Sequence, residues 1–461
     1  AALVLAAGLA IHASRLIGAY GAGFYSLIRR TTVWMVIIVV GLAVGVFGWE
    51  KLAERRAIGA LPPAAAGGPN ILFIVLDTVR AKSMSLYGHT RQTTPQLEQL
   101  AKSGVVFERA LATAPWTLPS HGSMFTGRFP YELSADFEKP LDSTYPTLAE
   151  FVRDRGYFTA GFSANMGYCG YESGLSRGFI HYDDYPLSLE QVVLSSSLYR
   201  TLINANNLVL EVGATPNRKS AEEINSDFLA WLSGKEERPF FAFLNYFDAH
   251  MPYLPPEPFD KKFGAQATKL DAYENCIAYL DHQVGLLFDE LKKRGVLENT
   301  LVIITSDHGE QFGEHGLTSH GNSLYMPLLH VPLLIIFPSR VPEGVRVREP
   351  VTLRDIPATV VDLFELEDES AFPGDSLAGY WNGARKPGSE ETRRLLSEER
   401  KMKSLLDGRY HYILNKHGVE ELYDLESDPA EERNLAETEE GRRECERFRR
   451  SLETILASNR K

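Results

Sequence analysis

The sequence predicts an α/β fold built around a central, mostly parallel β-sheet that is flanked by helices. The first observation is a set of continuous apolar runs, which are typical of strands buried on both faces of a parallel sheet. These runs are residues 70–76, 239–247, 300–305 and 331–337. The second observation is that helical patterns lie between the runs, at residues 94–103, 147–155, 221–232 and 271–294. Strands that alternate with helices indicate an α/β fold, and the sequence shows no internal repeat.

The composition is that of a folded chain that does not wrap nucleic acid. The length of 461 residues allows one large α/β domain, or one with a smaller appendage. Hydrophobic residues make up 44% of the chain, which excludes global disorder, and the net charge of −12 argues against a polyanion as partner. The three cysteines are widely spaced and form neither a CxxC metal pattern nor a disulfide framework.

Residues 1–56 are expected to form a membrane region, with a transmembrane helix at about residues 31–49. That stretch has no charged residue and is long enough to cross a bilayer. Upstream, residues 1–28 are also largely apolar and could form a second span. A signal peptide and a buried core helix are the alternatives. Basic residues flank the stretch almost equally on both sides, so charge does not decide its orientation.

Residues 57–69, AIGALPPAAAGGP, are rich in alanine, proline and glycine and are expected to be a linker. A catalytic domain is expected at residues 70–385. A small C-terminal subdomain is expected at residues 386–461.

Acidic residues follow three of the four apolar runs. Asp77 follows the first run, Asp248 the second, and Asp307-His308 comes one residue after the third. Ligands bind beyond the carboxyl ends of strands in open α/β sheets, so we expect these residues to form one site. Any one of these aspartates alone would more often cap a helix. The fourth run carries no acid at its end.

Thr117 lies in the run APWTLPSHGSMFTGR and is either a hydroxyl in a surface turn or a nucleophile. Asp77, Asp307 and His308 supply hard anionic ligands and an imidazole for a divalent metal ion. A hydroxyl held by a metal loses its proton more easily, so Thr117 would complete the set as the nucleophile. We expect Ser120 to cap the helix that follows this turn.

Further histidines are candidates for catalysis. His250 lies in FDAHMPY, and His315 and His320 lie in GEHGLTSHGN. They could bind a second metal, hold the substrate oxygens or protonate the leaving group. For His315 a structural role in its loop is an equal alternative. Asp248 could orient His250 or bind a metal, and the residues leave this open.

Several motifs resemble those of the sulfatase family within the alkaline phosphatase superfamily. PNILFIVLDTVR resembles the first strand of that family, TLPSHGSMFTGR its nucleophile motif and SDHGEQFGEHG its metal-binding segment. FDAHMPY and the C-terminal ELYDLESDPAEERNLAE are similar to two further family motifs. The resemblance covers roughly residues 69–440 and implies an alkaline-phosphatase-like fold with a small C-terminal α+β subdomain.

The resemblance implies a metal-dependent enzyme that acts on sulfate or phosphate esters. It makes Asp77, Thr117, Asp307 and His308 metal ligands, and it lets His250 and His320 contact the transferred group. The resemblance suggests three residues that contact the substrate: Arg80, Asn165 and His121. Arg80 could instead only brace its loop.

The departures from the family pattern concern the nucleophile and the metal. Thr117 stands where the family has the Cys or Ser that is oxidised to formylglycine, and no formylglycine is expected because the β-carbon of threonine carries a methyl group. Thr78 replaces a second Asp, and His308 stands where calcium-type sulfatases often have Asn. Losing a carboxylate and gaining an imidazole favours Zn or Mn over Ca. His121 and His320 stand where the family has Arg and Lys.

These departures leave two enzymatic hypotheses and one bland alternative. The first is a hydrolase of sulfate or phosphate esters that is tethered to the lipid bilayer, with its catalytic domain outside the cytoplasm. The second is a membrane phosphotransferase similar to phosphoethanolamine and phosphoglycerol transferases, for which residues 187–210 could form an interfacial helix. The third, a binding module without catalysis, is disfavoured by the retained ligands. Specificity is expected from loops 131–146 and 166–218.

Overall fold

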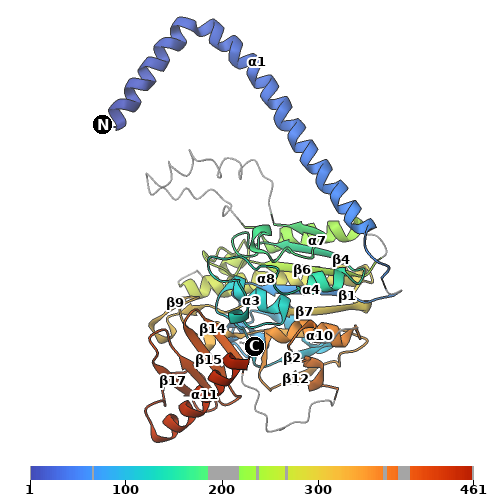
Figure 1. Ribbon diagram of the computed structural model, residues 1–461, viewed down its shortest axis with the longest axis vertical. Helices are drawn as coiled ribbons and strands as arrows, with labels where there is room; N and C mark the ends of the chain where they lie inside the picture. The colour runs from blue at the N-terminus through green and yellow to red at the C-terminus, as the bar shows by residue number, and fades with distance from the viewer. Residues whose placement is uncertain are drawn as a thin grey trace. The chain divides into compact units, whose positions relative to one another are not determined.

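The computed structural model describes residues 2–64, 67–184, 218–234, 238–264, 268–366, 371–382 and 395–458. The chain divides into two units, Ala1–Ala60 and Leu61–Lys461. The first unit is the helix α1 (Ala2–Gly59), and the second contains every other described element (Figure 1).

Helix α1 includes the predicted span at residues 31–49. The most apolar 18-residue window of its segment Tyr25–Gly59 has a mean hydropathy of 2.3, and none of that window is buried, which disfavours a soluble core helix. By length and composition the segment could cross a membrane, and a signal sequence would pass the same test. The helix also continues to Gly59, three residues into the predicted linker.

The central sheet of the second unit has eight described strands in the order β12-β2-β11-β7-β1-β6-β4-β5. Five of its neighbouring pairs are parallel and two are antiparallel, and both antiparallel pairs involve β11. The sheet is therefore mixed, and β11 is the exception to the predicted parallel order. The strand bounds are β1 Asn70–Leu76, β2 Val105–Phe107, β4 Phe158–Ser163, β5 His181–Asp183, β6 Phe240–Tyr246, β7 Thr300–Thr305, β11 Leu333–Ile336 and β12 Val345–Val347.

The predicted strand at residues 331–337 is in fact two strands that belong to different sheets. Its start joins β10 (His330–Val331), which pairs with β3 (Ala110–Leu111) in a small sheet that also holds β13 (Val351–Thr352). Pro332 separates β10 from β11, which runs antiparallel to β7. The carboxyl end of β11 therefore lies at the opposite edge of the central sheet, which explains why no acid follows it.

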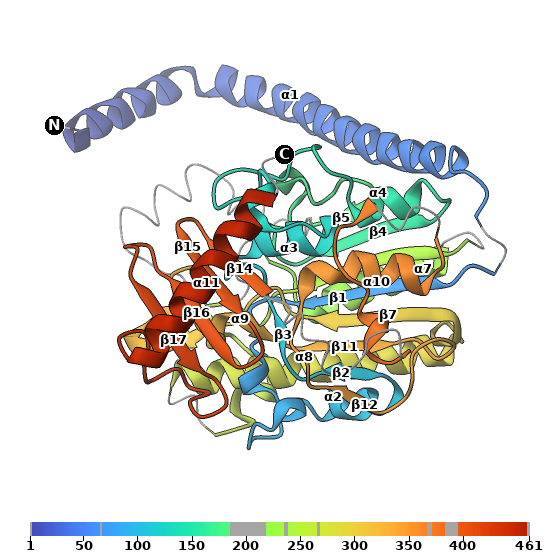
Figure 2. The ribbon, with the colours of Figure 1, turned by 60° about the horizontal axis from the view of Figure 1, so that its bottom comes forward.

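Helices cover both faces of the central sheet because successive side chains of a buried strand point to opposite faces. Ile71, Phe73 and Val75 pack in one apolar cluster with α3 (Thr117–Thr126), α4 (Leu148–Arg153) and α10 (Ile356–Leu363) (Figure 2). Leu72, Ile74 and Leu76 pack in a second cluster with α2 (Pro95–Leu100), α7 (Ala221–Gly234) and α8 (Lys269–Lys293). Of these helices, α2, α4, α7 and α8 agree with the four predicted helical patterns, except that a separate short turn, Ala101–Ser103, follows α2.

The C-terminal part is a four-stranded antiparallel sheet covered by one helix (Figure 1). Helix α11 (Glu439–Ser458) packs on the sheet through Phe448 and Leu452, against Leu405 and Leu422. We call these elements the C-terminal subdomain; they lie inside the predicted range 386–461. The strands are β14 Leu395–Glu399, β15 Met402–Leu406, β16 Tyr410–Leu414 and β17 Glu420–Asp424.

Candidate active site and metal centre

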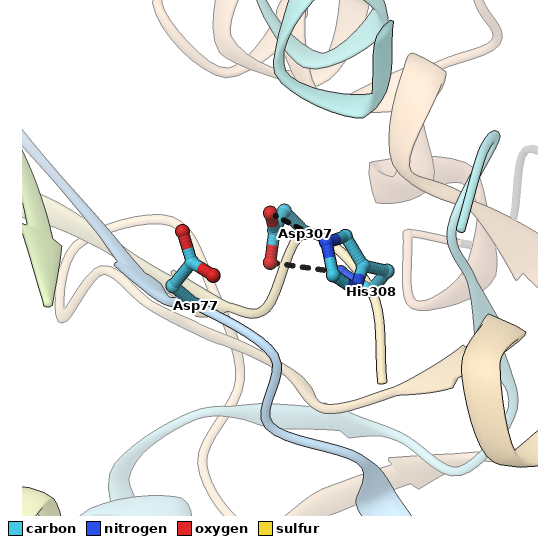
Figure 3. A group of neighbouring side chains, drawn as sticks. All are labelled: Asp77, Asp307 and His308. Atoms are coloured by element: carbon cyan, nitrogen blue, oxygen red, sulfur yellow. Dashed lines mark hydrogen bonds and ion pairs between the residues drawn. The ribbon is translucent and has the colours of Figure 1, made fainter. Parts of the chain in front are cut away.

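The neighbouring parallel strands β1 and β7 bring together the residues that follow them. Asp77 comes directly after β1, and Asp307 and His308 come shortly after β7 (Figure 3). One ligand atom from each side chain lies within 4.8 Å of the others, and all three residues are fully buried. The strand-end argument therefore correctly places these three residues together.

Each aspartate of this cluster has one oxygen that is hydrogen-bonded and one that is not. Asp77 Oδ2 accepts from the side-chain amides of Asn165 (2.9 Å) and Asn245 (3.4 Å). Asp307 Oδ1 accepts from the backbone N–H groups of Thr78 and His308. Asp77 Oδ1 and Asp307 Oδ2 are buried and have no hydrogen-bond partner within the described parts of the chain. Buried carboxylates without partners are costly, so Asp77 and Asp307 are candidate ligands of a cation.

His308 is held in the form that binds a metal. Burial lowers the pKa of His308 to about 4, so its ring is neutral. Its Nδ1 lies 2.9 Å from the carbonyl oxygen of Gly309 and must donate its proton there. The other nitrogen, Nε2, then carries a lone pair; it lies 3.4 Å from Asp307 Oδ2. A histidine fixed through Nδ1–H by a carbonyl is the usual arrangement of a metal ligand.

Without a cation the cluster is electrostatically strained. Burial, followed by the charge of Asp307, raises the pKa of Asp77 well above its ordinary value. The backbone is strained as well, because Thr78 has a φ of 62° in the left-handed region that β-branched residues avoid. This conformation directs the N–H of Thr78 to Asp307 Oδ1 at 3.1 Å. Such strain beside a ligand pair is typical of a functional site.

Thr117 begins helix α3 and is not part of a surface turn. Its side chain is 2% exposed, and its Oγ1 lies 3.3 Å from His308 Nε2. Ser120, expected as the cap of the following helix, lies inside α3, and its hydroxyl donates to the carbonyl of Asp307 at 2.7 Å. The prediction for Ser120 was wrong because the helix starts three residues earlier, at Thr117 itself. Ser120 instead ties α3 to the segment that carries Asp307.

His121 lies one helical turn after Thr117 in α3 and is fully buried. Its Nδ1 is 2.8 Å from the carbonyl oxygen of Thr117 and 3.7 Å from Asp307 Oδ2. Burial lowers the pKa of His121, which favours the neutral ring. These contacts are with Thr117 and Asp307, so the predicted role of His121 on the substrate side stays a prediction.

Arg80 and Asn165 hold other site residues in place. Arg80 is 3% exposed and donates to Ser83 Oγ, to the carbonyl of Glu310 and to the carboxylate of Glu314. These contacts agree with the alternative that Arg80 braces its loop. Asn165 is 2% exposed and donates to Asp77, while its own side-chain oxygen accepts from the N–H of Tyr168. Their predicted substrate contacts remain predictions.

The imidazole rings of His308, His320 and His250 follow one another in space. The ring centroids of His308 and His320 are 4.6 Å apart, and those of His320 and His250 are 5.2 Å apart. His250 stacks on Phe247 with centroids 4.2 Å apart, and burial lowers its pKa. His320 is also in contact with Trp116, the residue before Thr117, with ring centroids 5.1 Å apart.

A buried carboxylate that the sequence analysis did not select holds His320. Glu310 Oε1 lies 3.1 Å from His320 Nδ1, and Glu310 Oε2 accepts from the hydroxyl of Tyr253 at 2.8 Å. Burial alone would raise the pKa of Glu310, but the hydrogen bond from His320 holds it below its ordinary value. Since Nδ1 of His320 donates to a carboxylate, its Nε2 is the nitrogen left for chemistry. Glu310 follows Asp307-His308 by two residues, which was a usable signal.

Asp248 does not join the other strand-end acids. Its Oδ2 accepts from the N–H of Ala221 at 3.0 Å, at the start of α7, and burial raises its pKa to about 7. The expectation of one site with all three aspartates was therefore wrong for Asp248, which anchors a helix. Asn245, the one amide in the otherwise apolar strand β6, donates to Asp77 instead.

His315 stacks on Tyr325 with ring centroids 3.6 Å apart, in agreement with the structural role that was its alternative.

A cavity of about 400 Å³ opens beside the residues that follow Thr117 and Asn165. Residues of both predicted specificity loops, 131–146 and 166–218, line the cavity. Residues 185–217 of the second loop lie outside the described residues, and so does the predicted interfacial helix at 187–210. Trp116 contacts Phe137 and Tyr168 of the lining, and so joins the cavity to His320. The lining includes Leu118, Phe137, Met166, Tyr168, Tyr171 and Asp184.

Comparisons with known proteins identify the family and the fold of the chain. A family model described as Sulfatase matches residues 69–366. Choline-sulfatase of Rhizobium meliloti (strain 1021) is 27% identical over 448 residues, which cover 81% of this chain and 84% of that protein. Arylsulfatase of Clostridium perfringens (strain 13 / Type A) is 23% identical over 461 residues, covering 83% and 93%. The crystal structure of the phosphonate monoester hydrolase of Agrobacterium radiobacter superposes with a TM-score of 0.68 at 22% identity, covering 85% and 96%, and shows the shared fold.

Proposed function

The chain belongs to the sulfatase family of hydrolases, and we propose that it is a metal-dependent hydrolase of sulfate or phosphate esters with Thr117 as its nucleophile. The observation that carries this proposal is the position of Thr117 Oγ1, 3.3 Å from His308 Nε2. That nitrogen belongs to the buried cluster in which Asp77 and Asp307 each present an oxygen without a hydrogen-bond partner in the described residues. A hydroxyl at a buried cation site is an activated nucleophile.

Asp77, Asp307, His308 and Thr117 would hold the metal ion. Two carboxylates, one imidazole and one hydroxyl favour Zn or Mn, because Ca prefers a shell made of oxygen ligands alone. When bound, the metal supplies positive charge that lowers the pKa of a neighbouring hydroxyl and stabilises developing negative charge. Asn165 and Asn245 orient Asp77 for this role, as outer-shell partners do in metal sites.

The residues of the chain account for each bond and proton of the reaction. Thr117 Oγ1 attacks the sulfur or phosphorus, a bond forms to that atom, and the bond to the ester oxygen breaks. His250 and His320 carry the proton that Thr117 loses and the proton that the leaving alcohol gains. Water then attacks the same centre and loses a proton, the bond to Thr117 Oγ1 breaks, and Thr117 Oγ1 takes up a proton, so the threonine hydroxyl is restored; the same histidines carry both protons.

The alcohol part of the substrate is placed in the cavity beside Leu118 and Met166. The cavity is lined by the aromatic side chains of Phe137, Tyr168 and Tyr171, which offer apolar faces to this part of the substrate. The names of the similar proteins, choline-sulfatase, arylsulfatase and phosphonate monoester hydrolase, support an ester as the substrate. These names are those of hydrolases, so the phosphotransferase alternative is not favoured. We further propose that α1 tethers the enzyme to a lipid bilayer, with the catalytic unit outside the cytoplasm.

Turnover by the full chain of one aryl leaving group, offered as a sulfate, a phosphate monoester and a phosphate diester, tests this function. Each ester is assayed with Mn, Zn and Ca. We expect turnover with Mn or Zn, at least a thousandfold loss in Thr117→Ala and partial activity in Thr117→Ser, which keeps the hydroxyl. Unchanged turnover in Thr117→Ala would refute the nucleophile. Turnover that survives exhaustive chelation would refute the metal.

A further inference from the structure

Glu431 of the C-terminal subdomain is an unusual residue for its place in the chain. It lies in the loop between β17 and α11, yet it is 1% exposed. Its φ is 59°, in the left-handed region that a non-glycine residue adopts only when the surrounding structure compensates the strain. A buried carboxylate on a strained backbone calls for an explanation in its contacts.

Both oxygens of Glu431 are used, and they point in different directions. Oε1 accepts from Nδ1 of His411 on β16, at 2.5 Å, inside the subdomain. Oε2 accepts from the backbone N–H of Met326 at 2.7 Å, outside it. Met326 is the first residue of the short helix α9 (Met326–Leu329). His411 is itself 1% exposed, so the C-terminal sheet holds the carboxylate against α9.

Helix α9 in turn holds the residue next to the metal ligand His308. The N–H of Gly309 donates to the carbonyl of Leu328 in α9 at 2.8 Å. A Cβ atom at position 309 would lie 2.0 Å from the carbonyl oxygen of Pro327, so the backbone of Gly309 packs directly on the helix. The carbonyl of Gly309 accepts the Nδ1 proton of His308 at 2.9 Å, which fixes the ring orientation and leaves Nε2 for the metal.

From these contacts we infer that Glu431 is a positioning residue for the metal ligand His308 and acts through α9 and Gly309. The inference rests on the proposed metal site and extends it to the C-terminal subdomain. It also gives a function to the motif ELYDLESDPAEERNLAE, in which Glu431 is the first of two adjacent glutamates. The subdomain is then part of the machinery that sets metal affinity.

A second carboxylate of the same subdomain provides a matched control. Glu421 on β17 accepts from the hydroxyl of Tyr325 at 2.7 Å, one residue before Met326. Its bond ends on a side chain and leaves the backbone of α9 untouched. Loss of Glu421 therefore weakens the contact between the subdomain and this segment without releasing the helix that holds Gly309.

The test is the Mn²⁺ affinity of the full chain, measured by calorimetric titration well below the unfolding temperature. Glu431→Ala should weaken binding roughly threefold to tenfold, less than the 10–100-fold typical of a direct outer-shell partner, because it acts one step further away. Glu431→Gln should recover most of the affinity, since its amide oxygen can still accept from Met326 N–H. Glu421→Ala should stay within about twofold of the wild type on the same reasoning.

Met326→Pro keeps the test decisive if Glu431→Ala does not fold. Proline is tolerated at the first position of a helix, and Tyr325 before it is extended with ψ of 158°, so this change removes only the donor N–H and the methionine side chain. It should lose as much affinity as Glu431→Ala. Wild-type affinity in folded Glu431→Ala or in Met326→Pro, or an equal loss in Glu421→Ala, would overturn the inference alone. A wild-type chain that binds neither Mn²⁺ nor Zn²⁺ would overturn the metal site and this inference together.

Discussion

Replacing Asp77 with asparagine should stabilise the metal-free protein while abolishing metal binding. The side chains of Asp77 and Asp307 bring ligand atoms within 4.8 Å of each other in a fully buried site. At an effective dielectric constant of about 20, two unit charges at that distance repel by about 3 kcal/mol. In Asp77→Asn the amide oxygen can still accept from Asn165, and an uncharged amide nitrogen takes the place of Oδ1, which removes the repulsion with Asp307.

The pH dependence of this effect follows from the raised pKa of Asp77. A carboxyl whose folded pKa is raised contributes stability below its unfolded pKa, and that stability is lost as the pH rises through the folded pKa. The wild type should therefore lose stability on the alkaline side, whereas Asp77→Asn should not. The difference should be largest at alkaline pH in the presence of a chelator, and it should shrink toward acid pH.

The assay is thermal unfolding of the chelator-treated full chain, followed through the unit Leu61–Lys461. An unfolding entropy of ~2.1 cal/mol/K per residue turns 3 kcal/mol into a rise of roughly 4 °C in that unit. Added Mn²⁺ should raise the midpoint of the wild type and leave that of Asp77→Asn unchanged. A chelated variant that unfolds below the chelated wild type at alkaline pH would refute the argument that Asp77 and Asp307 are an unneutralised pair.

Three further changes test Asn165 and Glu310 in the site and Asp248 outside it. Asn165→Ala should weaken Mn²⁺ binding about tenfold, because Asp77 loses its closer amide donor; titration at constant pH measures this, and wild-type affinity would contradict it. Glu310→Gln should slow the turnover of a phenyl ester about tenfold more than that of a 4-nitrophenyl ester, because a poor leaving group depends more on proton donation and His320 loses its carboxylate partner. Equal losses of turnover for the two esters would mean that Glu310 only maintains structure. Asp248→Asn should remove a loss of stability between about pH 4 and pH 7, because burial raises the pKa of Asp248 to about 7; unfolding in urea across this range measures it, and a parallel pH profile in both proteins would contradict it.

Much of the fold could be predicted because it depends on local pattern. Residues 70–76 and 300–305 form strands with the predicted bounds, since continuous apolar runs suit strands covered on both faces. The run at 331–337 shows the limit of this reasoning. An apolar run has the same pattern in either strand direction, so the antiparallel order of β11 depends on its path through the molecule.

Some residues of the candidate site could be predicted from the sequence, and others could not. Asp77 and Asp307-His308 could be predicted together because parallel strands end at one edge of a sheet, whatever lies between them in the chain. Asp248 follows the same rule in the sequence, but its side chain caps α7, and Asn245 inside the strand reaches Asp77 instead. Three residues along a chain change the direction of a side chain completely, and only the packed backbone sets that direction.

The sequence by itself determined the apolar strands, the acids at their ends and a threonine, Thr117, that cannot become formylglycine, because these are properties of residue type and short spacing. Only the tertiary structure decided which polar groups contact the site and its supporting segments. Glu310 binds His320, His121 contacts the carbonyl of Thr117, and Glu431 accepts from Met326 of α9. Glu431 and Met326 lie 105 residues apart. Contacts over such separations depend on the folded path of the backbone, because a hydrogen bond requires two groups within about 3 Å, a condition that no local pattern encodes.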